Sequence, residues 1–108
     1  QETSFIDVTV FKCDSDTTLK AYTATWCGPC RRVKPAFLET MAHNGGQVEQ
    51  ESQIPKTEFK KTVSDFIPFF EVVRNQQRID AIQTSDASKL HVFLSRNNIQ
   101  KHLFDDNF

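Results

Sequence analysis

Two cysteines three positions apart, Cys27 and Cys30, stand at a junction between two hydrophobic patterns. The segment Leu19 to Trp26 before them has the composition of a buried β-strand. From Pro29 onward, apolar residues recur with helical spacing, and a proline suits the first turn of a helix. A cysteine pair spaced in this way can close a small disulfide with little backbone movement and reopen as a dithiol. The junction therefore predicts a strand, a turn and a helix in succession, with a reversible thiol pair at the turn.

The rest of the chain alternates strand-like and helix-like segments. Apolar residues with a period of two predict strands, and recurrence at i, i+4 and i+7 predicts helices. The expected strands are Phe5 to Phe11, Leu19 to Trp26, a short one around Gln47 to Glu51, Phe69 to Val73, and Arg78 to Gln83. The expected helices run from Pro29 to a stop at Asn44-Gly45-Gly46, from Lys56 to Phe66, and from a cap at Ser85 or Asp86 into a helical extension over residues 97–108. We expect an α/β sandwich with a central sheet flanked by helices, mixed because a tight turn joins the last two strands.

Length and charge limit the classes of protein to which this chain can belong. Its 108 residues, without a repeat or a linker, are expected to form one domain. The 13 Lys and Arg residues nearly balance the 14 Asp and Glu residues, so the chain lacks the positive field that drives nucleic-acid binding. The longest apolar stretch, Phe66 to Phe70, is far shorter than the about 20 residues of a transmembrane helix. We expect a soluble monomer that binds no nucleic acid and does not span a membrane.

The compartment is less constrained. No leader-like segment opens the chain, and its first residue is Gln1. We favour an intracellular location and leave a cleaved organellar or secretory leader open.

The two cysteines are expected to have different tasks. Cys27 would lie at the N-terminus of the helix, where unpaired backbone N–H groups and the helix dipole favour a thiolate. Cys30 would lie one turn further in and be more buried. Gly28 is expected to allow a close turn and to leave the sulfur accessible, and Pro29 to fix φ and stiffen the pair. Cys27 is therefore the expected nucleophile and Cys30 the resolving thiol.

The string Ala24 to Cys30, Ala-Thr-Trp-Cys-Gly-Pro-Cys, resembles the active-site signature of the thioredoxin family. Pro35, five positions after the second cysteine, is similar to the proline that kinks the active-site helix in that family. Ile67-Pro68, directly before an apolar strand, is similar to the family's cis-proline. The resemblance covers Leu19 to about Arg96 and implies a thioredoxin-like fold whose first helix is shortened or absent.

The same resemblance implies a thiol-disulfide oxidoreductase that reduces disulfides in client proteins. Cys27 would attack as the thiolate, and Cys30 would resolve the mixed disulfide. Trp26 would offer the substrate a flat surface, and the backbone of Ile67 would pair with the substrate strand. A cis Pro68 would shape that groove and keep metal ions off the thiols. The resemblance implies no bound cofactor, and it implies a dithiol electron donor, such as a thioredoxin-reductase-like protein, that recycles the disulfide.

The sequence departs from the family pattern at several positions. Ala21 stands six positions before Cys27, where the family usually has a buried aspartate that takes a proton from the second cysteine. A water or another carboxylate would then have to serve Cys30, and Glu49 is the candidate on the third strand. The usual glycines after the fourth strand and near the end of the fifth are absent, with Gln76 at the first of these positions. These departures leave a second hypothesis open, in which the domain is a binding or scaffold subunit with weak redox activity.

Two further alternatives concern the chemistry of the cysteine pair. The thioredoxin-like domains of protein disulfide isomerase commonly have a histidine where Pro29 stands, so Pro29 favours reduction over oxidation or isomerisation. A zinc site would need two more ligands from a set that lacks metal-ligand spacing: Cys13, His43, His91 and His102. Cys13 is expected to be an exposed thiol in a polar turn, with a regulatory disulfide or a dimer link as the alternative. No chemistry is assigned to the three histidines.

Overall fold

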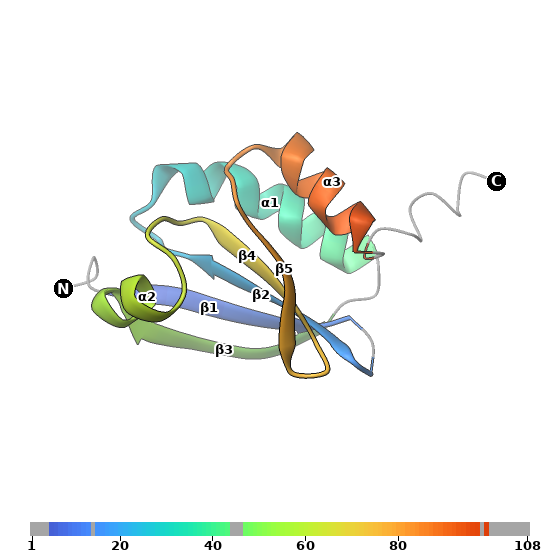
Figure 1. Cartoon of the computed structure of the whole chain (residues 1–108). Coiled ribbons are helices and arrows are strands. Elements are labelled where there is room, and N and C mark those ends of the chain that lie inside the picture. Colours follow the sequence, from blue (N-terminus) through green and yellow to red (C-terminus); the bar gives the residue numbers. More distant parts are fainter. Residues whose placement is uncertain (1–4, 14, 44–46, 98, 100–108) are drawn as a thin grey trace.

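The computed structural model describes residues 5–13, 15–43, 47–97 and 99. The strands are β1 (Phe5–Lys12), β2 (Thr17–Thr23), β3 (Gln47–Pro55), β4 (Phe69–Arg74) and β5 (Gln77–Gln83). The helices are α1 (Gly28–His43), α2 (Lys56–Thr62) and α3 (Ala87–Arg96). Helices α1 and α3 cover one face of the sheet, and α2 packs against the other (Figure 1). This arrangement confirms the expected α/β fold with helices on the faces of a central sheet.

The strands are ordered β3-β1-β2-β4-β5, and every neighbouring pair is antiparallel. The expectation of a mixed sheet is therefore wrong. Only residues 13–16 join β1 to β2, whereas a parallel pair would need a crossover of about a dozen residues. The same short link leaves no room for a helix, and the described residues have none between these strands. The expected loss of the first helix is confirmed.

The alternation of side chains along β2 and β4 divides the interior into two clusters. In β2, Leu19 and Ala21 face α1 and α3, while Tyr22 faces α2. In β4, Phe70 faces the α1 side and Phe69 the α2 side. The larger cluster, on the α1 side, contains Phe11, Leu19, Ala21, Val33, Phe37, Met41, Phe70, Val72, Leu90, Phe93, Leu94 and Ile99. Strand β2 therefore lies between two packed layers, which fix the position of the turn that follows it.

Strand β3 is longer than its sequence pattern predicts. It continues to Pro55, four residues beyond Glu51. Among the side chains described in β3, that of Ile54 is half-buried and the others are exposed. The backbone of β3 pairs with β1 along the outer edge of the sheet, with Ile54 opposite Ile6. An edge strand held by backbone pairing needs little apolar surface, so alternation could not reveal its full length.

Two predicted boundaries shift next to the cysteines and the cis-proline. Strand β2 ends at Thr23 instead of Trp26. Helix α2 ends at Thr62 instead of Phe66, and the Phe66 side chain is 68% exposed. The helical spacing of Phe66 therefore misled the prediction, because the chain leaves the helix one turn before it.

The hairpin and the last helix follow their sequence signals. Asn75 and Gln76, the central residues of the turn between β4 and β5, have positive φ angles of 55° and 68°. This is typical of a two-residue hairpin turn, and it confirms the predicted antiparallel hairpin. Asp86 caps α3, because its Oδ1 accepts a hydrogen bond from the backbone N–H of Ser88 at 2.8 Å.

Most of the expected helical extension over residues 97–108 lies outside the described residues. Of this segment, Asn97 and Ile99 are described, and the Ile99 side chain is buried in the cluster on the α1 side. None of the described helices is long and apolar enough to cross a bilayer.

Candidate active site

The cysteine pair lies at the junction between β2 and α1. After β2 ends at Thr23, the backbone N–H of Cys27 donates to the carbonyl of Ala24 at 3.2 Å, which closes a tight turn. Helix α1 begins directly afterwards, so Cys30 falls in its first turn. Cys27 and Cys30 form a disulfide with their Cα atoms 5.3 Å apart. The predicted succession of strand, turn and helix with a thiol pair at the turn is confirmed.

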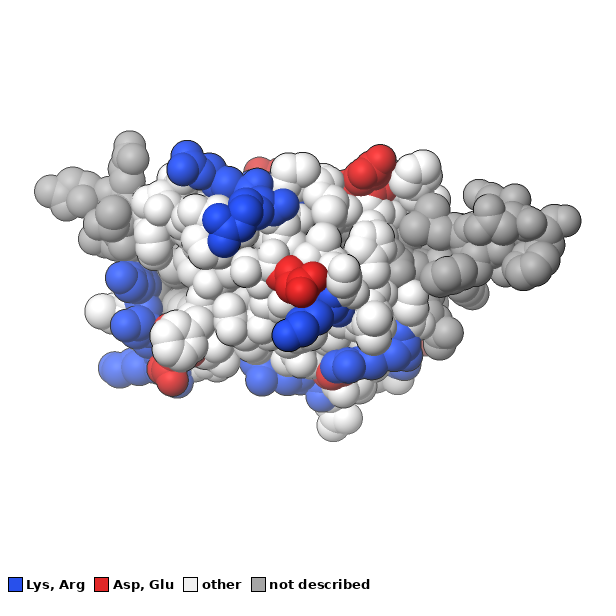
Figure 2. Space-filling model, turned by 90° about the horizontal axis from the view of Figure 1, so that it is seen from above, with Lys and Arg blue, Asp and Glu red and all other residues white. Residues whose placement is uncertain are grey.

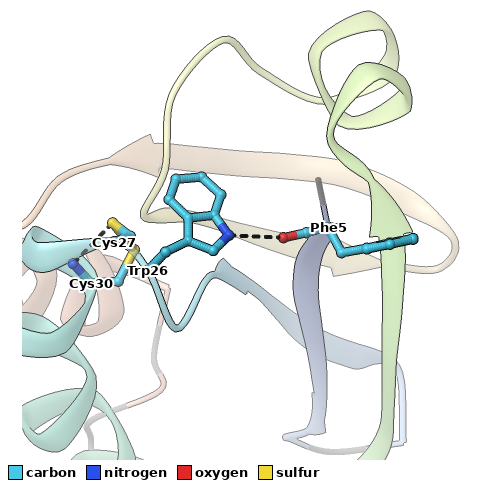
Figure 3. Close-up of a disulfide and its surroundings, with 4 residues drawn as sticks. All are labelled: Phe5, Trp26, Cys27 and Cys30. Carbon is cyan, nitrogen blue, oxygen red and sulfur yellow. Dashed lines mark hydrogen bonds between the residues drawn. A yellow bond between two sulfur atoms is a disulfide. The ribbon is translucent and has the colours of Figure 1, made fainter. Parts of the chain in front are cut away.

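The two sulfurs differ in burial and in hydrogen bonding. The side chain of Cys27 is 7% exposed and that of Cys30 is 1% exposed. The backbone N–H of Cys30 donates to Sγ of Cys27 at 3.2 Å (Figure 3). In the reduced protein, a donor in this position and the N-terminus of α1 both stabilise a negative charge on Cys27. The geometry thus favours Cys27 as the thiolate.

Gly28 is not required by the turn itself. A Cβ atom added there would meet nothing within 4 Å, and the φ angle of Gly28 lies outside the left-handed region. The expectation that glycine permits a close turn is therefore not supported. What the missing side chain does is leave the space beside Cys27 open.

Trp26 lies between the disulfide and the start of β1 (Figure 3). Its indole N–H donates to the backbone carbonyl of Phe5 at 3.4 Å. The ammonium of Lys56 lies 5.1 Å from the centre of the indole ring, within the range of a cation–π contact. The ring is half-buried against the cysteines and against the cluster on the α2 side. Trp26 is therefore an anchored wall of the site, less exposed than the sequence suggested.

The segment before β4 contributes the second wall. The Ile67–Pro68 peptide bond is cis, as the resemblance implies, and Pro68 is fully buried. Ile67, like Trp26, packs against the cluster of Ala24, Cys27 and Cys30 while part of Ile67 stays exposed. The exposed ring of Phe66 precedes it in the chain. The exposure of Phe66 was not predicted, because its spacing placed it on the inner face of a helix.

Positive charge gathers over the first turns of α1 (Figure 2). Arg31, Arg32 and Lys34 are exposed there, and the first turn of α1 holds no acidic residue. A hollow of about 340 Å³ opens beside them. It is lined by Thr23, Ala24, Thr25, Cys30, Arg31 and Lys34. Cys30 therefore borders a hollow whose charged lining residues, Arg31 and Lys34, are cationic.

No carboxylate lies where the family's aspartate would stand. Ala21 is buried in the apolar cluster on the α1 side. Glu49, the expected substitute, is exposed on the edge strand β3, and β1 separates β3 from β2. Glu49 also lies near the end of β1 that is remote from the turn at Thr23, because Val48 pairs with Phe11. The hypothesis that Glu49 serves Cys30 is wrong.

Cys13 and the two described histidines, His43 and His91, lie on other parts of the fold. Cys13 is half-buried against the cluster on the α1 side, so its predicted full exposure is wrong. His43 is exposed at the end of α1, and His102 lies outside the described residues. Across the described ranges, no group of three or more His, Cys, Asp or Glu residues could hold a metal ion.

The fold and the disulfide define a class of protein that has a cysteine pair, able to form a disulfide or a dithiol, at the start of a helix. Comparison with known proteins gives the family. The thioredoxin family model matches residues 2–96, and the chain belongs to the thioredoxin family. Taken with the Cys27–Cys30 pair, this makes it a thiol-disulfide oxidoreductase.

Two relatives illustrate the similarity. A curated thioredoxin from Malassezia sympodialis is 29% identical over 83 residues, which span 69% of this chain and 75% of that protein. The crystal structure of Malassezia sympodialis thioredoxin (Mala s 13) matches with a TM-score of 0.48 and 22% identity, over 67% of this chain and 68% of that one.

Proposed function

We propose that this protein reduces disulfides in client proteins through a Cys27–Cys30 dithiol cycle. The observation that carries the proposal is the disulfide at the N-terminus of α1, with the Cys30 N–H directed at Sγ of Cys27. In the reduced protein this donor and the helix dipole favour the Cys27 thiolate, which is the form that attacks a disulfide.

The cycle has two exchange steps. The Cys27 thiolate attacks one sulfur of the client disulfide, forms a mixed disulfide and releases the other client sulfur as a thiolate. Cys30 then loses its proton and attacks Sγ of Cys27, which expels the second client thiolate and leaves the Cys27–Cys30 disulfide. The Cα separation of 5.3 Å allows this closure without rearrangement of the helix. A dithiol donor, such as a thioredoxin-reductase-like protein, returns the two electrons.

The client is proposed to bind across the walls of the site. The half-buried Trp26 offers an apolar face beside Cys27, and the backbone of the half-buried Ile67 is proposed to offer hydrogen-bonding groups to an extended client segment. The buried Pro68, joined to Ile67 by a cis peptide bond, is proposed to shape this binding surface. Phe66, whose side chain is exposed, directly precedes Ile67 in the chain and is proposed to extend this apolar surface. The expected clients are proteins with an accessible disulfide in an extended segment.

Reduction is the proposed direction because Pro29 stands between the cysteines. Domains of this family that oxidise or isomerise disulfides commonly have a histidine there. A histidine that becomes protonated would stabilise the thiolate further and make the disulfide a stronger oxidant. With Pro29 that contribution is missing, so the disulfide is expected to be the more stable state.

A mixed-disulfide trap tests the proposal. Cys30→Ser, prepared with Cys13→Ser, should form a covalent adduct with a disulfide-bonded protein such as insulin, detected on a non-reducing gel. Cys27→Ser in the same background is the matched control and should form no adduct. Equal trapping by both variants, or none by Cys30→Ser, would contradict the assignment and leave the scaffold hypothesis in its place.

A further inference from the structure

The hollow beside Cys30 is lined by a buried threonine whose hydroxyl has no hydrogen-bond partner among the described residues. Thr23 is 4% exposed and is the last residue of β2. It faces α1, because Leu19 and Ala21, its neighbours at alternate positions, face α1. Within the described part of the chain, no hydrogen-bond partner is found for the Thr23 side chain. Thr23 and Cys30 line the same hollow.

A buried hydroxyl without a partner costs about 1–3 kcal/mol, so water is the expected partner in a hollow of this size. The hollow measures about 340 Å³. A water molecule occupies about 30 Å³ in the liquid, so several fit. The hollow is open to the exterior, and two of its lining residues, Arg31 and Lys34, have exposed side chains. Water that binds Thr23 is thereby connected to bulk solvent.

The charged lining fits the release of a proton from Cys30. Arg31 and Lys34 are the charged residues that line the hollow, and neither forms an ion pair with any residue in the described ranges. Cations beside a thiol stabilise its thiolate, but they cannot accept its proton. The acceptor must therefore be another group, and Ala21 supplies none. The carboxylate of Asp7, opposite Thr23 on β1, accepts a hydrogen bond from Gln53 and does not line the hollow.

We propose that this hollow is the water-filled proton exit of Cys30, and that Thr23 is the positioning residue that holds its first water. The inference rests on the proposed dithiol cycle. When the mixed disulfide resolves, the proton of Cys30 passes to water held by Thr23 and leaves to bulk solvent between Arg31 and Lys34. The Cys30 sulfur then forms its bond to Sγ of Cys27, and the bond to the client sulfur breaks with its electron pair. The client thiolate takes up a proton from solvent.

Ellman's reagent separates the two exchange steps in time. The reduced protein, in a Cys13→Ser background, should release one thionitrobenzoate when Cys27 attacks and a second when Cys30 resolves the mixed disulfide. Thr23→Val removes the hydroxyl and keeps the shape of the side chain. We expect the second phase to slow about three- to tenfold, with its pH midpoint shifted upward, and the first phase to keep its rate.

Two further variants keep the test decisive. Thr18→Val is the matched control, because Thr18 is half-buried on the same strand and points away from α1. Thr23→Ser retains the hydroxyl and should restore the second phase even if Thr23→Val folds poorly. The charged or titratable groups that border Cys30 or its hollow are Cys27, Arg31 and Lys34, and Asp7 lies opposite Thr23 on β1, where its carboxylate accepts from Gln53. During the second phase Cys27 is held in the mixed disulfide, and Asp7→Asn serves as the control for a contribution of this carboxylate to the pH midpoint.

The outcomes separate the two proposals. An unchanged second phase and pH midpoint in Thr23→Val would overturn the proton exit while leaving the dithiol cycle intact. Equal slowing of both phases would also overturn it, because that result indicates disturbed packing. The absence of a fast first phase in the parent protein would instead contradict the proposed function.

Discussion

Two adjacent residues of β2, Tyr22 and Thr23, place polar groups on opposite faces of the same sheet. The hydroxyl of Tyr22 donates to Oε1 of Glu71 at 2.9 Å, and Nε of Arg78 donates to Oε2 at 2.7 Å. The hydroxyl of Thr23 has no such partner among the described residues. In the Tyr22–Glu71–Arg78 network each side chain is hydrogen-bonded to another, and the network stabilises the fold. Thr23 instead lines the hollow that Cys30 also lines.

The electrostatics of the network support its structural role. Burial, together with the nearby charge of Glu71, raises the pKa of Tyr22 above its usual value. The phenol therefore stays protonated and remains a donor at any pH near neutrality. The guanidinium of Arg78 also lies 5.5 Å from the ring centre of Phe69. A network with all its partners in the protein has no group left to exchange protons with a substrate.

The largest expected effect comes from removing the centre of the network. Glu71, whose side chain is almost fully buried, holds both Tyr22 and Arg78. Glu71→Ala leaves the phenol without an acceptor and should lower the free energy of unfolding by about 2 to 3 kcal/mol. Urea denaturation measures this, with Glu51→Ala on the exposed face of β3 as the control. A loss below about 1 kcal/mol would show that the network is not a structural element.

A smaller loss is expected when only the donor is removed. Tyr22→Phe retains the ring contacts with Phe59 and Phe69 and deletes one hydrogen bond. It should lower the free energy of unfolding by about 1 to 2 kcal/mol. A double-mutant cycle with Glu71→Ala should show that the two losses are not additive. Additive losses would mean that Tyr22 and Glu71 act independently.

Asp80 is the centre of another polar cluster, with Arg96 and Asn97, which lies closer to the surface than the Tyr22–Glu71–Arg78 network. Its carboxylate accepts from Arg96 at 2.7 Å and from Asn97 at 2.9 Å, and the bond from Arg96 is the main reason why its pKa falls to about 2. A lowered pKa in the folded state stabilises the fold above the unfolded value near 4, and this stabilisation is lost as the pH falls toward 2.

Asp80→Asn should therefore cost less than about 1 kcal/mol at pH 7, because solvent screens the partly exposed pair. Thermal unfolding of both proteins between pH 7 and pH 2 measures the difference. It should shrink below pH 4. A constant difference over the whole range would contradict the charge-based explanation.

The smallest effect on stability is expected at Thr23. Because its hydroxyl has no protein acceptor in the described ranges, Thr23→Val should change the free energy of unfolding by less than about 0.5 kcal/mol. Urea denaturation provides the measurement. A loss above about 1 kcal/mol would show that the hydroxyl stabilises the fold, and the contrast with Tyr22 would disappear.

The sequence predicted those parts of the fold in which one residue pattern has one physical cause. Alternation of apolar side chains revealed β1, apolar composition revealed β2 and β4, and the cap at Asp86 marked the start of α3. The full length of β3 was missed, because an edge strand depends on backbone pairing rather than on apolar side chains. The antiparallel sheet was missed as well, although the short link of residues 13–16 contained the signal.

The site was predicted in its centre and missed at its border. Cys27, Cys30 and Pro68 belong to short motifs, so their positions followed from the sequence. The hollow is lined by residues from β2, the turn and α1 together, and no local sequence pattern around Thr23 predicts it. One usable signal was the polar residue that follows Tyr22 at the end of a buried strand.

The equilibrium between the Cys27–Cys30 disulfide and a glutathione or dithiothreitol buffer tests the central claim most directly. Each 30 mV corresponds to about 1.4 kcal/mol for this two-electron couple. A disulfide reductase with proline between its cysteines should have a reduction potential near about −270 mV, the value typical of thioredoxin. A potential near about −180 mV would identify an oxidant or isomerase instead and would contradict the proposed direction.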